Sequence, residues 1–164
     1  MGLSVTISAA DERDAEHILK LQYLCYQSEA ELYGDWSIEP LTQSLDALRA
    51  ELDEGHGLVA RLGDEVVASV RARLDEDGTV RIAKLIVHPR MQRHGLGGRL
   101  LDGIERHFAS GGEQLPVPPA KRFQLFTGHR SEGNLRLYRS KGYEQVATRE
   151  LGPRITLVTL EKAA

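Results

Sequence analysis

Residues 84–101 read Lys-Leu-Ile-Val-His-Pro-Arg-Met-Gln-Arg-His-Gly-Leu-Gly-Gly-Arg-Leu-Leu. An apolar strand, a turn stopped by a proline, a loop with Gly95, Gly97 and Gly98, and an amphipathic helix follow one another in this segment. Glycines lack a Cβ atom, so the main-chain N–H groups of such a loop can approach a ligand closely. The first N–H groups of the helix have no intrahelical partner and lie at the positive end of the helix dipole. The segment therefore predicts a cradle for an anionic diphosphate.

The residues around the glycines exclude two common phosphate-binding loops. A P-loop needs Gly-Lys followed by Ser or Thr, whereas Arg99 and Leu100 follow the last glycine here. A dinucleotide-binding fingerprint needs a third glycine at the position of Leu100. The segment matches instead the pattern Gln-x-x-Gly-x-Gly, as Gln92-Arg93-His94-Gly95-Leu96-Gly97, directly after a strand that ends in Val-x-Pro.

This pattern resembles the acyl-CoA-binding motif of the GNAT superfamily of N-acyltransferases. A second match lies downstream, at Leu137-Tyr138-Arg139-Ser140-Lys141-Gly142-Tyr143. The two motifs stand in the order and at the spacing of that family, and the resemblance covers nearly the whole chain. It implies an N-acetyltransferase with acetyl-CoA as cosubstrate and without a metal.

Periodicity and turn residues predict the elements before the glycine loop. A short strand at 4–8 precedes a helical stretch that opens at Asp11 and ends near Ala30, and a second helix follows Pro40. Three antiparallel strands then lead into the loop, at 58–62, 65–74 and 80–87, with turns at Gly63-Asp64 and Asp77-Gly78.

The elements after the glycine loop complete a single sheet. Ser110-Gly111-Gly112 ends the first helix, and a segment with Pro116, Pro118 and Pro119 is a connector to a strand at 122–127. A helix from Ser131 to Lys141 ends at Gly142 in the left-handed position, and strands at 144–148 and 155–160 follow. We expect residues 1–164 to form one N-acetyltransferase domain of the α+β class. It would have a GNAT-like, mixed, mainly antiparallel sheet with helices on both faces and the order β-α-α-β-β-β-α-β-α-β-β.

Bulk composition narrows the classes of partner. The chain has 164 residues and a net charge of -3, so nothing indicates bulk binding to nucleic acid or a membrane. We find no signal core and no apolar run long enough to span a bilayer. Cys25 is the one cysteine, which excludes an internal disulfide and zinc-type ligand spacing. We expect a cytoplasmic protein without a metal. The sequence does not decide between a monomer and a homodimer.

The resemblance assigns the cofactor site. The pantetheine arm would pair with the main chain of Leu85, Ile86 and Val87 like an added strand, and the diphosphate would rest on the loop. The cofactor-binding residues it implies are Leu85, Ile86, Val87, Gln92, Arg93, His94, Gly95, Leu96, Gly97, Gly98, Ser131 and Asn134. A side chain at Gly95 or Gly97 would collide with phosphate or force an unfavourable φ. The alternative is that these glycines only shape a strand-to-helix turn.

The resemblance also places a general acid at Tyr138. A phenol with its ordinary pKa of about 10 is protonated at neutral pH and can donate to the departing thiolate. The Val87 amide could polarise the thioester carbonyl. The alternative is that Tyr138 is a core aromatic with a satisfied hydroxyl.

The chain departs from the family pattern at two places. The helix that usually carries Asn-x-x-Ala-x-x-Leu-Tyr reads Ser131-x-x-Asn134-x-x-Leu137-Tyr138, so either Ser131 or Asn134 could contact pantetheine, or Ser131 only caps the helix. Many members place a glutamate base on the strand before the glycine loop, where this chain has Arg81 and Lys84. Deprotonation would then fall to a residue elsewhere, a water chain or bulk solvent.

The segment between the first two helices is the predicted acceptor side. It holds acidic and aromatic residues suited to a cationic amine, with Tyr26, Glu29, Glu31 and Tyr33 as substrate candidates beside Asp35 and Trp36. The alternative is an exposed polar loop whose aromatics pack on the core.

The leading hypothesis is direct acetyl transfer in a ternary complex, from acetyl-CoA to a small-molecule or peptide amine. We expect no acyl-enzyme, because Cys25 lies in an apolar helical pattern far in sequence from the cofactor motif and has no evident activating partner. The alternative is a non-catalytic CoA-binding sensor, which the missing strand glutamate favours. The missing P-loop lysine argues against a third hypothesis, that the chain is a nucleotide-binding protein.

Overall fold

The computed structural model describes residues 4–109 and 120–164. Within them, seven strands form one sheet in the spatial order β1-β2-β3-β4-β5-β7-β6, and every neighbouring pair is antiparallel except β4–β5. The strands are β1 Val5–Ala9, β2 His56–Leu62, β3 Glu65–Leu74, β4 Thr79–Val87, β5 Arg122–Gly128, β6 Glu144–Glu150 and β7 Thr156–Ala163. The predicted fold class is confirmed. The predicted helix stop at Ser110-Gly111-Gly112 and the connector with Pro116, Pro118 and Pro119 lie outside the described residues.

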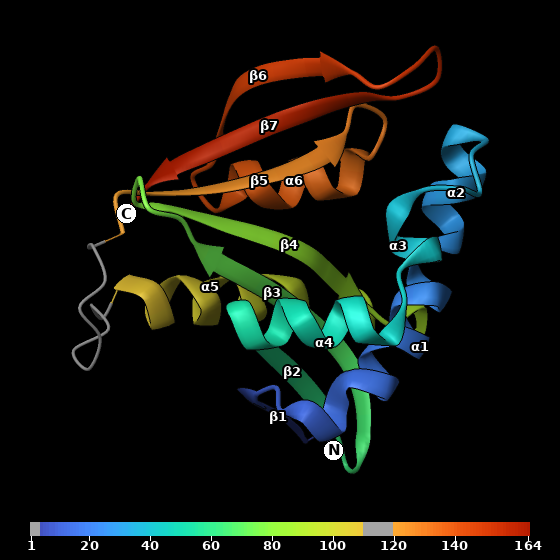
Figure 1. Cartoon of the computed structure of the whole chain (residues 1–164), viewed down its shortest axis with the longest axis vertical. Coiled ribbons are helices and arrows are strands. Elements are labelled where there is room, and N and C mark those ends of the chain that lie inside the picture. Colours follow the sequence, from blue (N-terminus) through green and yellow to red (C-terminus); the bar gives the residue numbers. More distant parts are fainter. Residues whose placement is uncertain (1–3, 110–119) are drawn as a thin grey trace.

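Helices cover both faces of the sheet (Figure 1). The α-helices are α1 Ala15–Cys25, α2 Gln27–Tyr33, α3 Glu39–Thr42, α4 Leu45–Glu54, α5 Leu96–Ala109 and α6 Glu132–Ser140, and two short 3₁₀ helices are η1 Glu12–Asp14 and η2 Pro89–Met91. The helices α1 and α4 pack on one face of β2–β4, whereas α5 packs on the other. Connecting the parallel strands β4 and β5 requires a crossover, and α5 supplies it.

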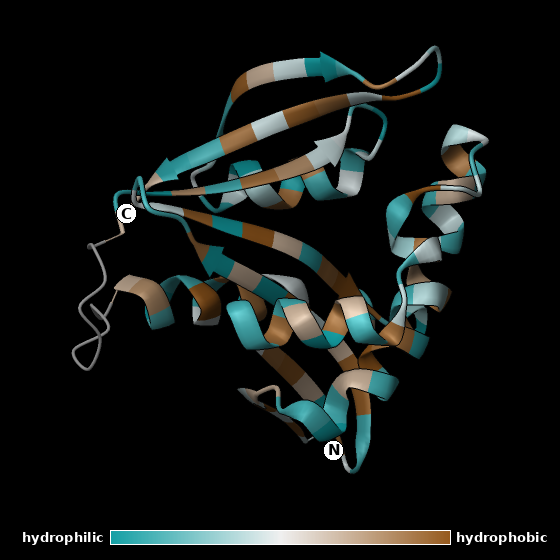
Figure 2. Ribbon diagram, in the orientation of Figure 1, coloured by the Kyte–Doolittle hydropathy of each residue, from teal (hydrophilic) through white to brown (hydrophobic). Residues whose placement is uncertain are grey.

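Two hydrophobic clusters hold the layers together. On the α5 side, Leu100, Leu101 and Ile104 are fully buried in a cluster with residues of β2–β5, β7 and α6. On the other face, Ile18 of α1 and Leu48 of α4 are buried together with strand residues. Figure 2 shows the matching pattern, with hydrophobic stripes on the helices and alternating hydropathy along the strands.

Each of the two helices predicted before β2 is divided in the structure. The first breaks at Tyr26 between α1 and α2, and the second breaks at Gln43 between α3 and α4. Gln43 has extended backbone (φ -63°, ψ 134°), which places its side chain in a buried network. Its Oε1 atom accepts hydrogen bonds from Gln22 (2.9 Å) and Arg71 (3.1 Å). Hydrogen bonding of buried polar groups therefore prevails over the apolar periodicity that predicts one helix.

The sheet opens between β4 and β5. These strands pair over only three residues each, from Thr79–Arg81 to Arg122–Gln124, and then diverge (Figure 1). Beyond this point β4 carries a bulge, because Ser69 pairs with Ile86 whereas Arg71 pairs with Ala83. Within the bulge Lys84 has φ +53°, which a lysine adopts at a cost of about 1–2 kcal/mol. The splayed strands leave room for a site inside the sheet.

Candidate active site between the splayed strands

Two adjoining clefts occupy the opening between β4 and β5. The wide cleft, of about 960 Å³, is lined by residues 82–85 of β4, 125–128 of β5, 151–155 before β7, and parts of α2 and α3. The narrow cleft, of about 450 Å³, runs from residues 85–87 along the glycine loop to α6. Tyr26, Glu29, Leu85 and Asn134 line both. A ligand can therefore extend from one cleft into the other.

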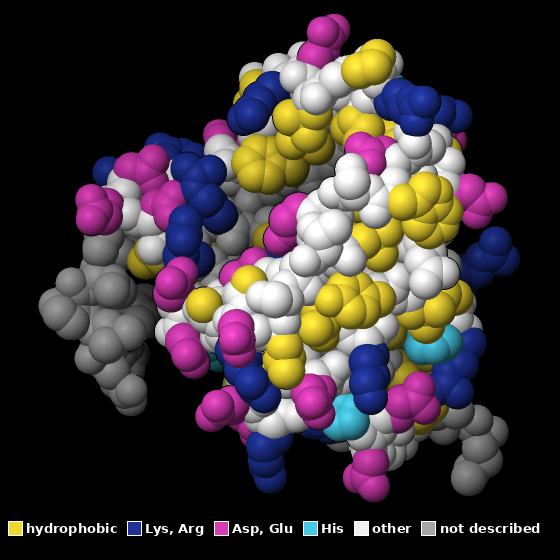
Figure 3. All heavy atoms as spheres, turned by 45° about the vertical axis from the view of Figure 1, so that its right-hand side comes forward, with side chains coloured by type: hydrophobic (Ala, Val, Ile, Leu, Met, Phe, Trp, Pro, Cys, Tyr) yellow, Lys and Arg dark blue, Asp and Glu magenta, His cyan; other side chains and the backbone are white. Residues whose placement is uncertain are grey.

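The walls of the wide cleft are largely apolar. In Figure 3, hydrophobic side chains gather around the hollow, with acidic side chains along its edge. Phe126 of β5 and Leu151 before β7 are 49% and 51% exposed on this surface. Exposed apolar side chains that gather at a cleft indicate a binding surface.

The end of β4 offers main-chain groups to the narrow cleft. The His88 N–H donates to Val67 O of β3 (2.8 Å), so by the alternation of a strand the main chain of Val87 faces the opposite way, into the opening. Val87 O accepts contacts there from Cys25 Sγ and Gln92 Nε2, each at 3.4 Å. Leu85, Ile86 and Val87 all line this cleft. The edge on which the sequence predicts pantetheine pairing is therefore open.

The glycine loop begins helix α5 as predicted. Gly95 has φ +74°, and its carbonyl accepts the first helical hydrogen bond, from Arg99 N at 3.0 Å. Gly97 has a different constraint: a Cβ atom there would lie 3.2 Å from Leu137 Cδ2 of α6. The predicted φ argument thus applies to Gly95, whereas Gly97 allows close packing of α6 on the loop.

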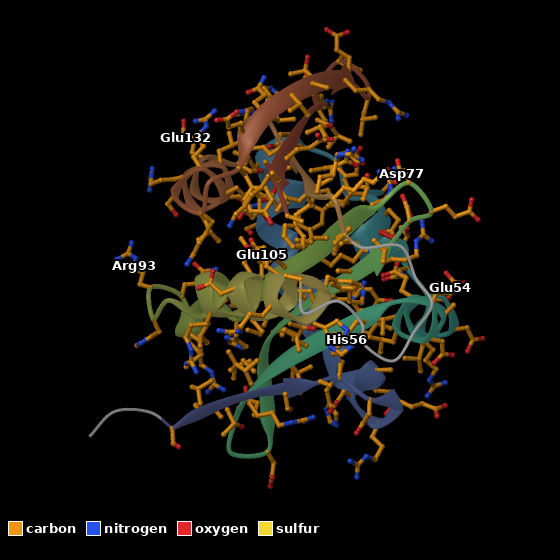
Figure 4. All side chains as sticks on the ribbon, turned by 90° about the vertical axis from the view of Figure 1, so that its left-hand side faces the viewer. Glu54, His56, Asp77, Arg93, Glu105 and Glu132 are labelled. Atoms are coloured by element: carbon orange, nitrogen blue, oxygen red, sulfur yellow. The ribbon has the colours of Figure 1, made fainter. Side chains whose placement is uncertain are left out.

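Most of the predicted loop residues line the narrow cleft. Gln92, Arg93, Gly95, Leu96, Gly97 and Gly98 do so, whereas His94 is exposed outside it. Arg93 has φ +69°, a conformation the sequence analysis missed, and its side chain projects from the loop into solvent (Figure 4). The first main-chain N–H groups of α5, which have no intrahelical partner, therefore lie in the segment that lines the cleft.

Tyr138 of α6 is buried and lines the wide cleft. Within residues 4–109 and 120–164, the Tyr138 hydroxyl makes no hydrogen bond. The Tyr143 hydroxyl, in contrast, donates to Glu105 Oε2 at 2.8 Å. Burial, and after it the charge of Glu29, raises the pKa of Tyr138 above its ordinary value. The assumption of an ordinary pKa was therefore wrong. The raised pKa keeps the phenol protonated at neutral pH.

A chain of hydroxyls joins α2 to the start of α6. The Ser131 hydroxyl donates to Glu29 Oε2 (2.7 Å) and lies 2.7 Å from the Tyr33 hydroxyl. Because Ser131 has one proton to donate, Tyr33 donates to Ser131, and Tyr33 in turn accepts from Arg130 N (2.9 Å). Ser131 is the N-cap residue of α6 but makes no side-chain cap hydrogen bond, so the alternative that its hydroxyl only caps the helix does not hold. Its hydroxyl holds Glu29 in place.

A glycine makes room for this chain of hydroxyls. A Cβ atom at Gly128 would lie 2.0 Å from the Tyr33 hydroxyl. The glycine at the end of β5 was the only sequence signal for this contact, and periodicity could not connect it to a tyrosine 95 positions earlier. The Tyr33 hydroxyl therefore reaches Ser131 only because position 128 has no side chain.

The other candidates divide between the cleft and the outer surface. Asn134 lines both clefts and donates to Thr127 Oγ1 at 3.2 Å. Tyr26 lines both clefts, and burial, followed by the nearby Tyr138, raises its pKa. Glu31 and Trp36 are exposed and line neither cleft. Some of the residues predicted for the acceptor side therefore line a cleft, and others lie on the outer surface.

Cys25 lies at the narrow cleft, although sequence separation suggested that it would be remote from the cofactor motif. Burial raises the pKa of the Cys25 thiol to about 12, against the weaker opposing effect of its contact with Val87. The thiol is therefore protonated and a poor nucleophile at neutral pH. Cys25 is far from the cofactor motif in sequence but lies beside it in space.

Comparisons with known proteins agree with this architecture. The model of the acetyltransferase (GNAT) family matches residues 16–143. The PaiA N-acetyltransferase from Thermoplasma acidophilum, in complex with coenzyme A, is similar with a TM-score of 0.78 at 14% identity, over 98% of this chain and 99% of that one. The ribosomal-protein-S18-alanine N-acetyltransferase from Escherichia coli gives 0.77 at 14% identity, over 98% and 94%. An acetyltransferase of the GNAT family from Streptococcus pneumoniae gives 0.71 at 20% identity, over 98% and 100%.

At these levels of sequence identity, the solved structures show that this chain has the same fold. No curated protein is significantly similar to the chain in sequence. In residues 4–109 and 120–164, no helix has the length and hydrophobicity of a membrane span. In the same described part of the chain, no group of three or more His, Cys, Asp or Glu side chains is placed to ligate a metal.

Proposed function

The chain belongs to the GNAT acetyltransferase family, and from this premise we propose that it transfers an acetyl group from acetyl-CoA directly to an amine bound in the wide cleft. The observation that carries the proposal is the junction of the two clefts, where the edge of β4 passes from the narrow cleft into the wide cleft that Tyr138 lines. A thioester that lies along residues 85–87 would end at this junction. The acceptor is a small-molecule or peptide amine, and residues 1–164 act as one N-acetyltransferase domain.

The narrow cleft is the proposed cofactor site. The diphosphate would be held by main-chain N–H groups from Arg93 to Gly98, at the positive end of the α5 dipole. The pantetheine arm would add to the edge of β4 through hydrogen bonds with the main chain of Leu85 and Val87. Asn134, which lines both clefts, would contact the arm where it enters the wide cleft.

Tyr138 is the proposed general acid. As the amine attacks the thioester carbonyl, negative charge develops on the carbonyl oxygen, which the Val87 N–H would stabilise, and then on the departing sulfur. The Tyr138 proton would neutralise that sulfur. Burial raises the pKa of a thiol as well as that of a phenol, as Cys25 shows in the same cleft. The same surroundings therefore disfavour a free thiolate, and a proton transferred from Tyr138 to the departing sulfur would relieve that charge.

A second candidate is a CoA-binding sensor that does not turn over. Its support is that the two β4 side chains at the place of the usual base are both occupied. Arg81 contacts Asp75 and Gln124, and Lys84 is ion-paired to Glu39 (2.8 Å) and Glu51 (3.0 Å).

Calorimetric titration with acetyl-CoA, followed by a mass-spectrometric screen of amines for the gain of one acetyl group, separates the two functions. We expect binding heat and at least one acetylated amine. Binding of acetyl-CoA without acetylation of any amine would favour the sensor. The absence of binding heat would contradict both candidates.

A further inference from the structure

Glu29 stands where the acceptor cleft and the cofactor cleft meet. It lines both clefts from α2, and its charge is close enough to raise the pKa of Tyr138. One carboxylate oxygen, Oε2, accepts from Ser131. The other carboxylate oxygen, Oε1, accepts no hydrogen bond within residues 4–109 and 120–164. No lysine, arginine or histidine nitrogen of these residues lies within 4 Å of it. A half-buried carboxylate held by one oxygen can accept a donor from a ligand with the other.

The other two carboxylates of the wide cleft are already engaged. Asp35 Oδ1 accepts from both the N–H and the hydroxyl of Ser37, at 2.9 and 2.6 Å, and these bonds lower the pKa of Asp35. Glu39 is ion-paired with Lys84. Of these three carboxylates, Glu29 is therefore the one that lines both clefts and lies close to the proposed acid.

The groups around Glu29 favour a cationic ligand. Tyr26, Tyr138 and Cys25 are neutral at pH 7, because burial raises the pKa of all three. Tyr33 reaches Glu29 only through Ser131. The nearby cations are directed elsewhere: Lys84 to Glu39 and Glu51, Arg130 to Leu32 O, Arg71 to Glu51 and Gln22, and Arg154, which also lines the wide cleft, to Gly34 O. Within residues 4–109 and 120–164, Glu29 thus has a hydroxyl partner but no cationic one, and an ammonium group would supply the positive charge.

We propose that Glu29 binds the acceptor as an ammonium ion and takes the proton that activates it. This inference rests on the proposed acetyl transfer and assigns the step for which β4 offers no side chain. A primary amine with an ordinary pKa of about 10 is almost entirely protonated at pH 7, and its nitrogen has no lone pair until the proton leaves. The acceptor class is therefore a strongly basic amine, and not a weakly basic one.

Two residues, Glu29 and Tyr138, account for all the proton transfers of this reaction. The Glu29 carboxylate takes one proton from the ammonium, and the neutral nitrogen forms the C–N bond at the thioester carbonyl carbon. As the C–S bond breaks, the sulfur takes the Tyr138 proton, and the excess proton on nitrogen returns to the Tyr138 phenolate. Glu29 gives its proton to solvent when the products leave. The sum is one acetylated amine, one CoA thiol and one released proton.

The test compares Glu29→Gln with Glu31→Gln, which changes an exposed glutamate of the same helix outside both clefts. The amide oxygen of the substituted side chain can still accept from Ser131, so the fold and the affinity for acetyl-CoA should be retained. With a basic primary amine at pH 7, we expect kcat/KM to fall about 10²–10³-fold for Glu29→Gln and less than about 2-fold for Glu31→Gln.

The pH profile is the decisive readout. In the wild type, Glu29 takes the proton from the bound ammonium ion, so kcat/KM should change little with pH around neutrality. In Glu29→Gln it should rise about tenfold per pH unit towards the pKa of the acceptor, because only the free amine reacts. A weakly basic amine, neutral at pH 7, should lose far less with this variant. A uniform loss at every pH and with both amines would indicate a structural role and overturn the inference.

A second variant guards against misfolding of the first. Ser131→Ala leaves the carboxylate but removes the hydrogen bond that holds it, so kcat/KM with the basic amine should fall while the pH profile keeps the shape of the wild type. A profile like that of Glu29→Gln, in a variant that keeps the carboxylate, would contradict the inference. If the wild type binds acetyl-CoA but acetylates no amine, the proposed function itself fails. If the wild type is active and Glu29→Gln keeps its profile, only the role of Glu29 is wrong.

Discussion

The narrow and the wide cleft are built in opposite ways. The narrow cleft is formed largely by one contiguous segment, residues 85–98, and presents main-chain groups of β4 and of the α5 N-terminus. The wide cleft brings together side chains from α2, α3, β4, β5, α6 and the segment before β7. Main-chain geometry follows from local sequence, whereas a wall of distant side chains can change without loss of the cradle. A family can thus keep its cosubstrate while its acceptors vary.

Tyr138 tests the junction of the clefts, where the largest effect is expected. Tyr138→Phe removes the proposed acid from a buried ring and should lower kcat about 10²–10⁴-fold, while the Kd for acetyl-CoA changes less than about 3-fold. Stopped-flow or thiol-release kinetics together with calorimetry measure both quantities. The control is Tyr143→Phe, which loses the bond to Glu105 outside both clefts and should lower stability but not kcat. Equal kcat values for the two variants would refute the acid.

Glu51 tests the support beneath the wide cleft. It accepts from Arg71 Nε at 2.6 Å and from Lys84 in the β4 bulge at 3.0 Å. Glu51→Gln should lower the free energy of unfolding by about 1.5–3 kcal/mol near neutral pH, the range for hydrogen bonds to charged groups. Arg49→Gln, in the same helix with only a 3.9 Å contact to the exposed Asp46, is the control and should cost less.

The same residue predicts a pH dependence with a definite sign. Burial raises the pKa of Glu51, but the charges of Arg71 and Lys84 outweigh burial and hold this pKa below its ordinary value of 4.5. The unfolded chain therefore binds this proton more readily than the folded protein. The stabilisation is present above about pH 4.5 and is lost as the pH falls through the folded pKa. Urea unfolding from pH 7 to 3 should give a shallower acid loss for Glu51→Gln, and parallel curves would contradict the network.

Gly95 tests the main-chain character of the narrow cleft. Gly95→Ala and Gly63→Ala impose the same left-handed strain, φ +74° and +63°, at positions where a Cβ atom meets nothing within 4 Å. Both should lose about 1–2 kcal/mol of stability. Only Gly95→Ala should weaken CoA binding, by about tenfold, because relaxation of the loop moves the N–H groups that hold the diphosphate. The matched pair needs thermal melts and calorimetry, and equal Kd values would show that Gly95 only shapes the turn.

The smallest effect is expected on the wall of the wide cleft. Phe126→Ala should raise KM for an amine with an apolar body a few-fold, about 1 kcal/mol, and leave the Kd for CoA unchanged. Val146→Ala removes a similarly exposed apolar side chain from β6, outside both clefts, and should change neither constant. An effect of Phe126→Ala on CoA affinity would mean that the clefts are not separate in function.

Local sequence was a good guide to elements and turns. The strand–loop–helix order of residues 84–101 was confirmed, as were the turns at Gly63-Asp64 and Asp77-Gly78 and the left-handed Gly142, because these features depend on conformations of single residues. Local patterns failed at Gln43, where a buried hydrogen-bond network interrupts the helix. They also gave no sign that tertiary packing brings Cys25 to the narrow cleft, 62 positions of sequence from its contact Val87.

The amino-acid sequence by itself determined the family, the order of the elements and the glycine cradle, because each follows from short-range spacing and from the backbone freedom of individual residues. Tertiary structure alone decided the divergence of β4 from β5, the raised pKa of Tyr138 and the contact of Ser131 with Glu29. These depend on burial and on hydrogen bonds between residues far apart in the chain. Burial and long-range contacts exist only once the sheet has formed, and they set the protonation of the groups that would carry the reaction.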